Sequence, residues 1–133
     1  MTDLKCMDPV LKFLPIFEKQ GFSAGEVVAN KGQFPYINYS PEVRDFIKTL
    51  DESGLIRPFD WGSWQNEATR YFNDPVQLDS ADLDTLSKLL TLHLRKERFC
   101  EGHLKHMLES GHIVEILKRL RTIRKEDGHQ TDL

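Results

Sequence analysis

The 133-residue sequence lacks most features that assign a small protein to a specialised class. Its two cysteines, Cys6 and Cys100, have no paired spacing typical of a disulfide framework, so we expect free thiols in a reducing compartment. Its apolar runs are only a few residues long, and the first residues lack the basic-then-apolar order of a signal peptide. We therefore expect a cytoplasmic protein without a transmembrane segment.

Common catalytic and nucleotide-binding patterns are absent as well. The sequence has no Gly-x-Ser-x-Gly turn and no glycine-rich phosphate-binding loop. Cys100, His103 and His106 are spaced by three, but the first and third diverge around a helix. A fourth metal ligand would have to come from elsewhere: His93, His112 or Glu101. The sequence predicts neither a metal nor a cofactor.

The composition is that of one ordinary globular domain spanning residues 1–133. Hydrophobic residues make up 39% of the chain, charged residues 29%, and the net charge is −3. The charge is unevenly distributed: residues 1–94 hold 9 basic and 14 acidic residues, whereas residues 95–125 hold 9 and 4. Internal attraction between these blocks is the favoured interpretation, and a basic face for an acidic partner is the alternative.

Helix signals recur along the chain. Asp8 and Ser40 each precede a proline, an arrangement typical of a helix start, and Gly21, Gly54 and Gly111 follow apolar residues at helical spacing. Pro15 should bend or break the first helix. The six predicted helices span 9–20, 41–53, 61–71, a segment from Asp79 or Ser80 past His93, about 100–110, and about 113–125.

Residues 22–39 differ from the rest. The turn-like triplet 30–32 separates two short apolar stretches, which predicts a small β-hairpin near residues 26–39, with an ordered aromatic loop as the alternative. From Glu126 onward no apolar period remains, so we expect residues 126–133 to be frayed. The predicted fold is a mainly α, compact bundle of about six short helices with one small hairpin.

The densest polar segment contains Arg95, Arg98, Glu101 and His103. In a continuous helix Arg98 and Glu101 could pair, which favours a helix junction locked by an Arg–Glu network. The alternative is that the four residues form a site for a small anionic ligand, in a binding protein or an enzyme. A hydrolase built on two carboxylates, such as Glu67 and Glu101, is a weaker alternative.

The sequence also resembles a known family. The resemblance rests on Phe59-Asp60-Trp61, on Arg95…Arg98-Phe99-Cys100-Glu101-Gly102 and on Gly111-His112-Ile113, and it covers most of the chain. These motifs are similar to those of small bacterial proteins classed only as a domain of unknown function. The resemblance implies a bacterial origin and a mostly helical fold, but it implies no activity, cofactor or catalytic residue.

Our leading functional hypothesis is a non-catalytic module that binds another macromolecule, most plausibly a protein. Its candidate contacts are aromatic residues of the irregular segment, Phe34, Tyr36 and Tyr39, since loops often carry recognition. The basic helix 113–125 offers a second alternative, nucleic-acid binding through Arg119, Arg121 and Arg124. The net charge and a pI near 5.9 argue against a dedicated nucleic-acid binder. The sequence does not predict an oligomeric state.

Overall fold

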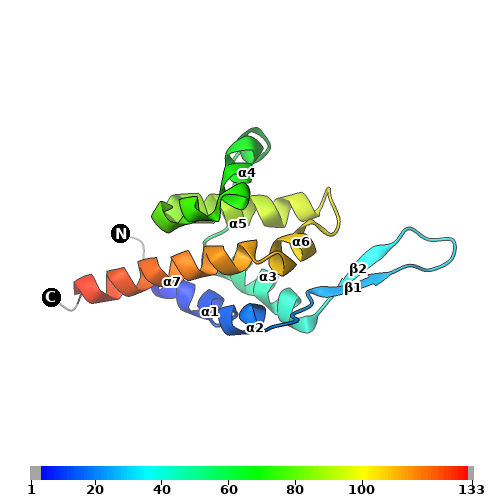
Figure 1. Cartoon of the computed structure of the whole chain (residues 1–133), viewed down its shortest axis with the longest axis horizontal. Coiled ribbons are helices and arrows are strands. Elements are labelled where there is room, and N and C mark those ends of the chain that lie inside the picture. The colour runs from blue at the N-terminus through cyan, green and yellow to red at the C-terminus, as the bar shows by residue number, and fades with distance from the viewer. Residues whose placement is uncertain (1–3, 132–133) are drawn as a thin grey trace.

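The computed structural model describes residues 4–131, with the backbone alone for 127–131, and in this part of the chain it consists of helices and one hairpin (Figure 1). The predicted mainly α class with a small hairpin is confirmed. The α-helices are α1 (Asp8–Leu11), α2 (Leu14–Glu18), α3 (Pro41–Ser53), α4 (Gln65–Asn73), α5 (Leu83–Glu97), α6 (His103–Glu109) and α7 (His112–Thr131). The hairpin strands are β1 (Gly25–Val28) and β2 (Tyr36–Tyr39), and three 3-10 helices are η1 (Leu4–Met7), η2 (Gly62–Trp64) and η3 (Pro75–Ser80).

Local sequence signals explain several helix ends. The Ser40 hydroxyl accepts a hydrogen bond from the Val43 N–H at 3.3 Å, and α3 ends at Gly54, which has a φ of 83°. Pro15 lies in the first turn of α2, and α1 and α2 are separated at Lys12 and Phe13, which keep helical backbone angles while the Phe13 N–H bonds to the Val10 carbonyl. Because proline cannot donate to a preceding carbonyl, the predicted break occurs one turn before it.

Three boundaries differ from the sequence prediction. The helix expected from Asp79 or Ser80 begins at Leu83, because residues 75–80 form η3 and Asp82 supplies the cap, its carboxylate accepting from the Thr85 N–H at 2.8 Å. The helix expected from Cys100 begins at His103, and the one expected from residue 61 begins at Gln65, after η2. Each region holds several residues able to cap a helix, so the pattern alone does not select one.

The last helix is longer than predicted. Its backbone continues through Thr131, whereas the apolar pattern predicted an end near Lys125 and a frayed tail over 126–133. Adding a residue to an existing helix fixes few dihedrals for one new hydrogen bond, so α7 can extend beyond its apolar stripe. Residues 132–133 of the predicted tail lie outside the described residues.

Helix α7 is the centre of the bundle. It packs against η1, α1 and α2 on one side and against α5, α6 and η3 on the other, as its central position in Figure 1 shows. Its contribution to the core is the buried stripe Ile113, Val114, Ile116, Leu117 and Leu120. Beneath it, the rings of Phe13, Phe17 and Phe46 meet, with centroids 4.9 Å apart for the last two.

Helix α5 holds the segment after α3 through two buried hydroxyl groups. The Ser87 hydroxyl donates to the Leu55 carbonyl, and the Thr91 hydroxyl accepts from the Arg57 N–H at 3.1 Å. Both hydroxyl side chains are buried on the apolar face of α5. They satisfy backbone groups where the chain has no regular structure, as buried polar groups require.

The hairpin projects from the bundle (Figure 1). No residue between Ala24 and Val43 is fully buried, and of the two strands only Tyr39 packs against the core. Among the described residues, no helix combines the length and the apolar character needed to cross a lipid bilayer.

Candidate functional site

The hairpin places two of the three predicted aromatic contacts in solvent. Its strands are antiparallel, with Val27 opposite Ile37 and Val28 opposite Tyr36. The connection between them carries Phe34, whose exposed fraction is 95%, and Tyr36 is 44% exposed. Val27 adds an aliphatic side chain that is 62% exposed. The projecting hairpin therefore presents exposed apolar side chains to solvent.

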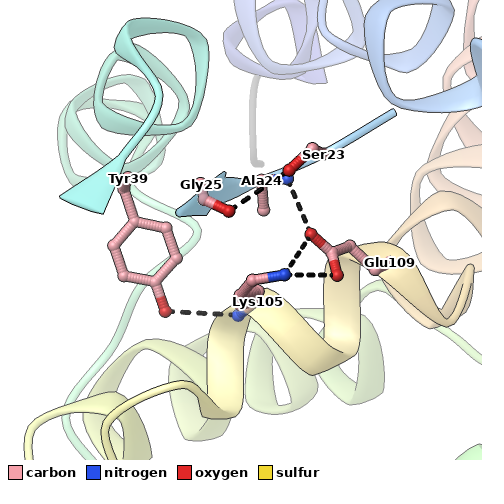
Figure 2. A network of polar contacts seen from close by, with 6 residues as sticks. All are labelled: Ser23, Ala24, Gly25, Tyr39, Lys105 and Glu109. Carbon is pink, nitrogen blue, oxygen red and sulfur yellow. Dashed lines mark hydrogen bonds and ion pairs between the residues drawn. The ribbon is translucent and has the colours of Figure 1, made fainter. Parts of the chain in front are cut away.

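Tyr39, the third predicted contact, anchors the hairpin to the bundle. It is half-buried, and its hydroxyl accepts a hydrogen bond from the Lys105 N–H at 3.2 Å (Figure 2). Burial raises the pKa of Tyr39, and a hydrogen bond to the Glu97 carboxylate raises it further. The phenol therefore stays protonated, and it links β2 to α5 and α6.

A second anchor lies beside Tyr39. Glu109 accepts a hydrogen bond from the Ala24 N–H at 2.9 Å, and the Lys105 ammonium lies 2.6 Å from its carboxylate (Figure 2). Burial by itself would raise the pKa of Glu109, but the hydrogen bonds from Lys105 and Ala24 outweigh it and lower that pKa. Ion pair and backbone bond together fix the start of β1 on α6.

The hairpin base also explains Gly25. A Cβ atom at this position would lie 2.4 Å from the Asn38 carbonyl oxygen across the ladder. The two strands approach so closely here that only glycine fits.

The polar segment 95–103 does not form the expected cluster. Helix α5 ends at Glu97, the chain turns through residues 98–102, and Gly102 has a φ of 94°. Arg98 and Glu101 are both exposed in this turn, and no ion pair joins them in the described part of the chain. Their spacing of three supports pairing only in a continuous helix, which the left-handed conformation of Gly102 interrupts.

Glu97 has the structural role that the sequence suggested for Arg98 and Glu101. Its carboxylate accepts hydrogen bonds from the Gly102 N–H at 3.2 Å and the Leu104 N–H at 2.8 Å. These N–H groups start α6 and have no partner inside it, so Glu97 caps this helix from the preceding one. Sequence reasoning missed this residue because the cap depends on the turn geometry.

Histidines from three helices meet beside this turn. His93 Nδ1 of α5 lies 2.9 Å from His103 Nε2 of α6, and the ring of His112 of α7 stands edge-on to His93 with centroids 5.0 Å apart. His93 and His112 are buried, and the Nε2 atom of each is sealed from solvent without a hydrogen-bond partner in the described structure. Burial lowers the pKa of His103 and of His112 to about 4 each, and that of His93 well below its usual value. All three rings are neutral at pH 7.

The histidine pair lines a cleft of about 230 Å³ between α4, α5 and α6. Of the four residues predicted as a ligand site, His103 lines this cleft, whereas Arg95, Arg98 and Glu101 do not. The other residues around it are Gln65, Ala68, Thr69, Phe72, Leu92, Lys96 and Met107. Among the described residues, no group of three His, Cys, Asp or Glu side chains has a metal-binding arrangement.

Two of the three predicted basic contacts are engaged within the fold. The Arg119 guanidinium donates to the Ala81 carbonyl at 2.8 Å, and Arg124 pairs with Asp8 at 2.9 Å. Arg121 is exposed. One ion pair, Arg124–Asp8, thus joins the basic block to the acidic N-terminal part of the chain, whereas Lys105 and Lys118 pair with carboxylates inside the basic block.

Comparison with known proteins identifies one family. Residues 3–126 match the model of a family described as "Family of unknown function (DUF6508)". No curated protein and no solved structure matches the chain. Since the match covers nearly the whole sequence, the chain belongs to this family of unknown function, in agreement with the resemblance seen in its motifs.

Proposed function

We propose that this chain is a non-catalytic module of the bacterial cytoplasm that binds another protein through the tip of its β-hairpin. The observation that carries the proposal is the 95% exposure of Phe34 at the end of a projecting hairpin. An aromatic ring in water at the tip of an ordered element gains free energy when a partner covers it. The firm anchoring of the hairpin base by Tyr39 and Glu109 lowers the entropy cost of presenting it.

The edges of the hairpin suit a protein partner. Within the described structure its sheet has two strands only, so the outer backbone groups of both β1 and β2 are unpaired in the ladder. A partner strand could add to either edge through main-chain hydrogen bonds, with its side chains packing beside Val27 or Tyr36.

The charge of the hairpin favours protein over nucleic acid. Residues 25–39 carry one acidic side chain, Glu26, and one basic side chain, Lys31. Nucleic-acid binding depends on several cations facing phosphates together. The remaining exposed arginine of the basic helix, Arg121, does not form such a group alone.

Paired pull-downs test the proposal. Immobilised protein should capture a defined partner from bacterial lysate, and Phe34→Ser should reduce that capture at least tenfold, since burial of an aromatic anchor contributes about 2 kcal/mol or more. The matched control is Val76→Ser, which removes a 72% exposed apolar side chain from η3, away from the hairpin. Equal capture by all three proteins, or equal loss in both variants, would contradict a role for the hairpin tip.

A further inference from the structure

The cleft between α4, α5 and α6 is a second site, independent of the hairpin. We propose that it binds a small carboxylate with a flat, apolar body. The carboxylate would lie between Lys96 and His103, and the body would lie on the apolar floor of the cleft.

The size and lining of the cleft set the class of ligand. Its volume of about 230 Å³ equals that of roughly eight liquid water molecules and lies below the ~300 Å³ at which pockets for drug-sized ligands begin. Its lining combines an apolar floor with polar side chains from all three helices, as in sites that orient a small amphiphilic molecule. The floor consists of Ala68, Phe72, Leu92 and Met107, and the polar residues are Gln65, Thr69, Lys96 and the two histidines.

The charge of the cleft selects an anion. Lys96 is the only lining residue that is charged at pH 7, because burial keeps His93 and His103 neutral. No ion pair to Lys96 occurs in the part of the chain that the structure describes. Glu97, the nearest acidic neighbour in sequence, directs its carboxylate to the N–H groups of Gly102 and Leu104. An ammonium beside an apolar floor and without a counter-ion matches a carboxylate.

The histidine pair supplies a directed donor. His103 Nε2 faces His93 Nδ1, while its other ring nitrogen, Nδ1, makes no hydrogen bond in the described structure and is not sealed from solvent. In the proposed complex His103 Nδ1–H donates to the ligand, and His103 Nε2 accepts a hydrogen bond from His93 Nδ1–H. The unpartnered Nε2 of His93, buried with only 4% of the residue exposed, is what this tautomer leaves as a bare nitrogen.

Three probes of matched shape or charge test the site. Benzoate carries both the flat body and the charge, benzyl alcohol the body alone, and acetate the charge alone. We expect benzoate to shift backbone amide resonances of α4, α5 and α6 in a saturable manner, with a dissociation constant at least fivefold lower than that of either other probe. The ring ¹⁵N resonances of His103 should report Nδ1–H as the benzoate complex forms.

Two variants and a control assign the binding to the cleft. Lys96→Gln should weaken benzoate binding at least fivefold, and Thr69→Trp should abolish it by filling the cleft from an exposed position. Lys125→Gln, at an exposed lysine of α7 outside the cleft, should leave binding unchanged. Absence of saturable shifts, equal affinity for benzyl alcohol, or equal effects of the two lysine variants would overturn the proposal.

Discussion

At the scale of single residues, Glu97 connects three elements that are separate in the sequence. Its carboxylate caps α6 and raises the pKa of the Tyr39 hydroxyl of the hairpin, while its own backbone ends α5. One side chain therefore holds the turn 98–102 in place, and the left-handed Gly102 lets the chain make that turn.

We expect Glu97→Gln to lower the free energy of unfolding by about 1 to 2 kcal/mol, because an amide oxygen replaces a charged acceptor of two backbone N–H groups. Chemical denaturation in urea measures the change. The control is Glu101→Gln in the same turn, where the side chain is exposed and the expected change is within about 0.5 kcal/mol. A larger loss in the control than in Glu97→Gln would contradict the capping role.

The sequence could not reveal these residue-level contacts. Helical spacing selected Arg98 and Glu101, but spacing predicts contact only while the helix continues, and the positive φ of Gly102 ends that path. The structure buries His93 on the apolar face of α5. Its contact with His103 arises only because α5 and α6 fold back on each other, and no local pattern encodes that distance.

At the scale of elements, local signals were most reliable where a cap, an apolar stripe and a glycine occur in order. Helix α3 has all three in Ser40, its buried face and Gly54, and its predicted bounds match the structure. The predicted start of α5 was wrong because Asp79, Ser80 and Asp82 can all cap a helix. The chain forms η3 over residues 75–80, and this leaves Asp82 as the cap. The hairpin position was confirmed, since its turn residues are local.

The hairpin anchor gives a prediction at the same scale. Glu109→Gln weakens the bond to the Ala24 N–H and removes the ion pair with Lys105, so the hairpin should detach from α6 more often. We expect amide hydrogen exchange in β1 and β2 to become about tenfold faster, which corresponds to about 1.4 kcal/mol of local stability. Hydrogen exchange followed by NMR measures it residue by residue.

The control for this prediction is Glu115→Gln, which removes a similar ion pair, with Lys118, on α7. It should leave exchange in the hairpin unchanged. Faster exchange spread evenly over the whole bundle in Glu109→Gln would show that Glu109 supports global rather than local stability.

At the scale of the whole molecule, the neutral histidines make the packing of α5, α6 and α7 sensitive to acid. The pKa of His103 and His112 falls from 6.5 in the unfolded chain to about 4 in the fold, and burial lowers that of His93 as well. The unfolded state therefore binds more protons below pH 6.5. Stability is complete above that pH and decreases toward pH 4, because the unfolded chain takes up protons that the folded histidines do not bind.

Thermal unfolding at pH 7 and pH 5 should show this loss, and His112→Phe should reduce it. The aromatic replacement keeps the ring contacts with Phe72 and His93 but removes one titrating group and an unpartnered buried nitrogen. His106→Phe, at an exposed histidine, should retain the full difference between the two pH values. An identical midpoint at pH 7 and pH 5 in the parent protein would be inconsistent with buried neutral histidines.

No side chain between Ala24 and Val43 is fully buried, yet both ends of the hairpin are tied to the bundle. Substitutions in residues 29–36 therefore remove no buried side chain and should leave the folding of the bundle unchanged. Substitutions in the core of the bundle likewise do not alter the exposed residues of the tip. The scaffold therefore tolerates change at the tip, and an engineered loop of similar length could take the place of the natural one.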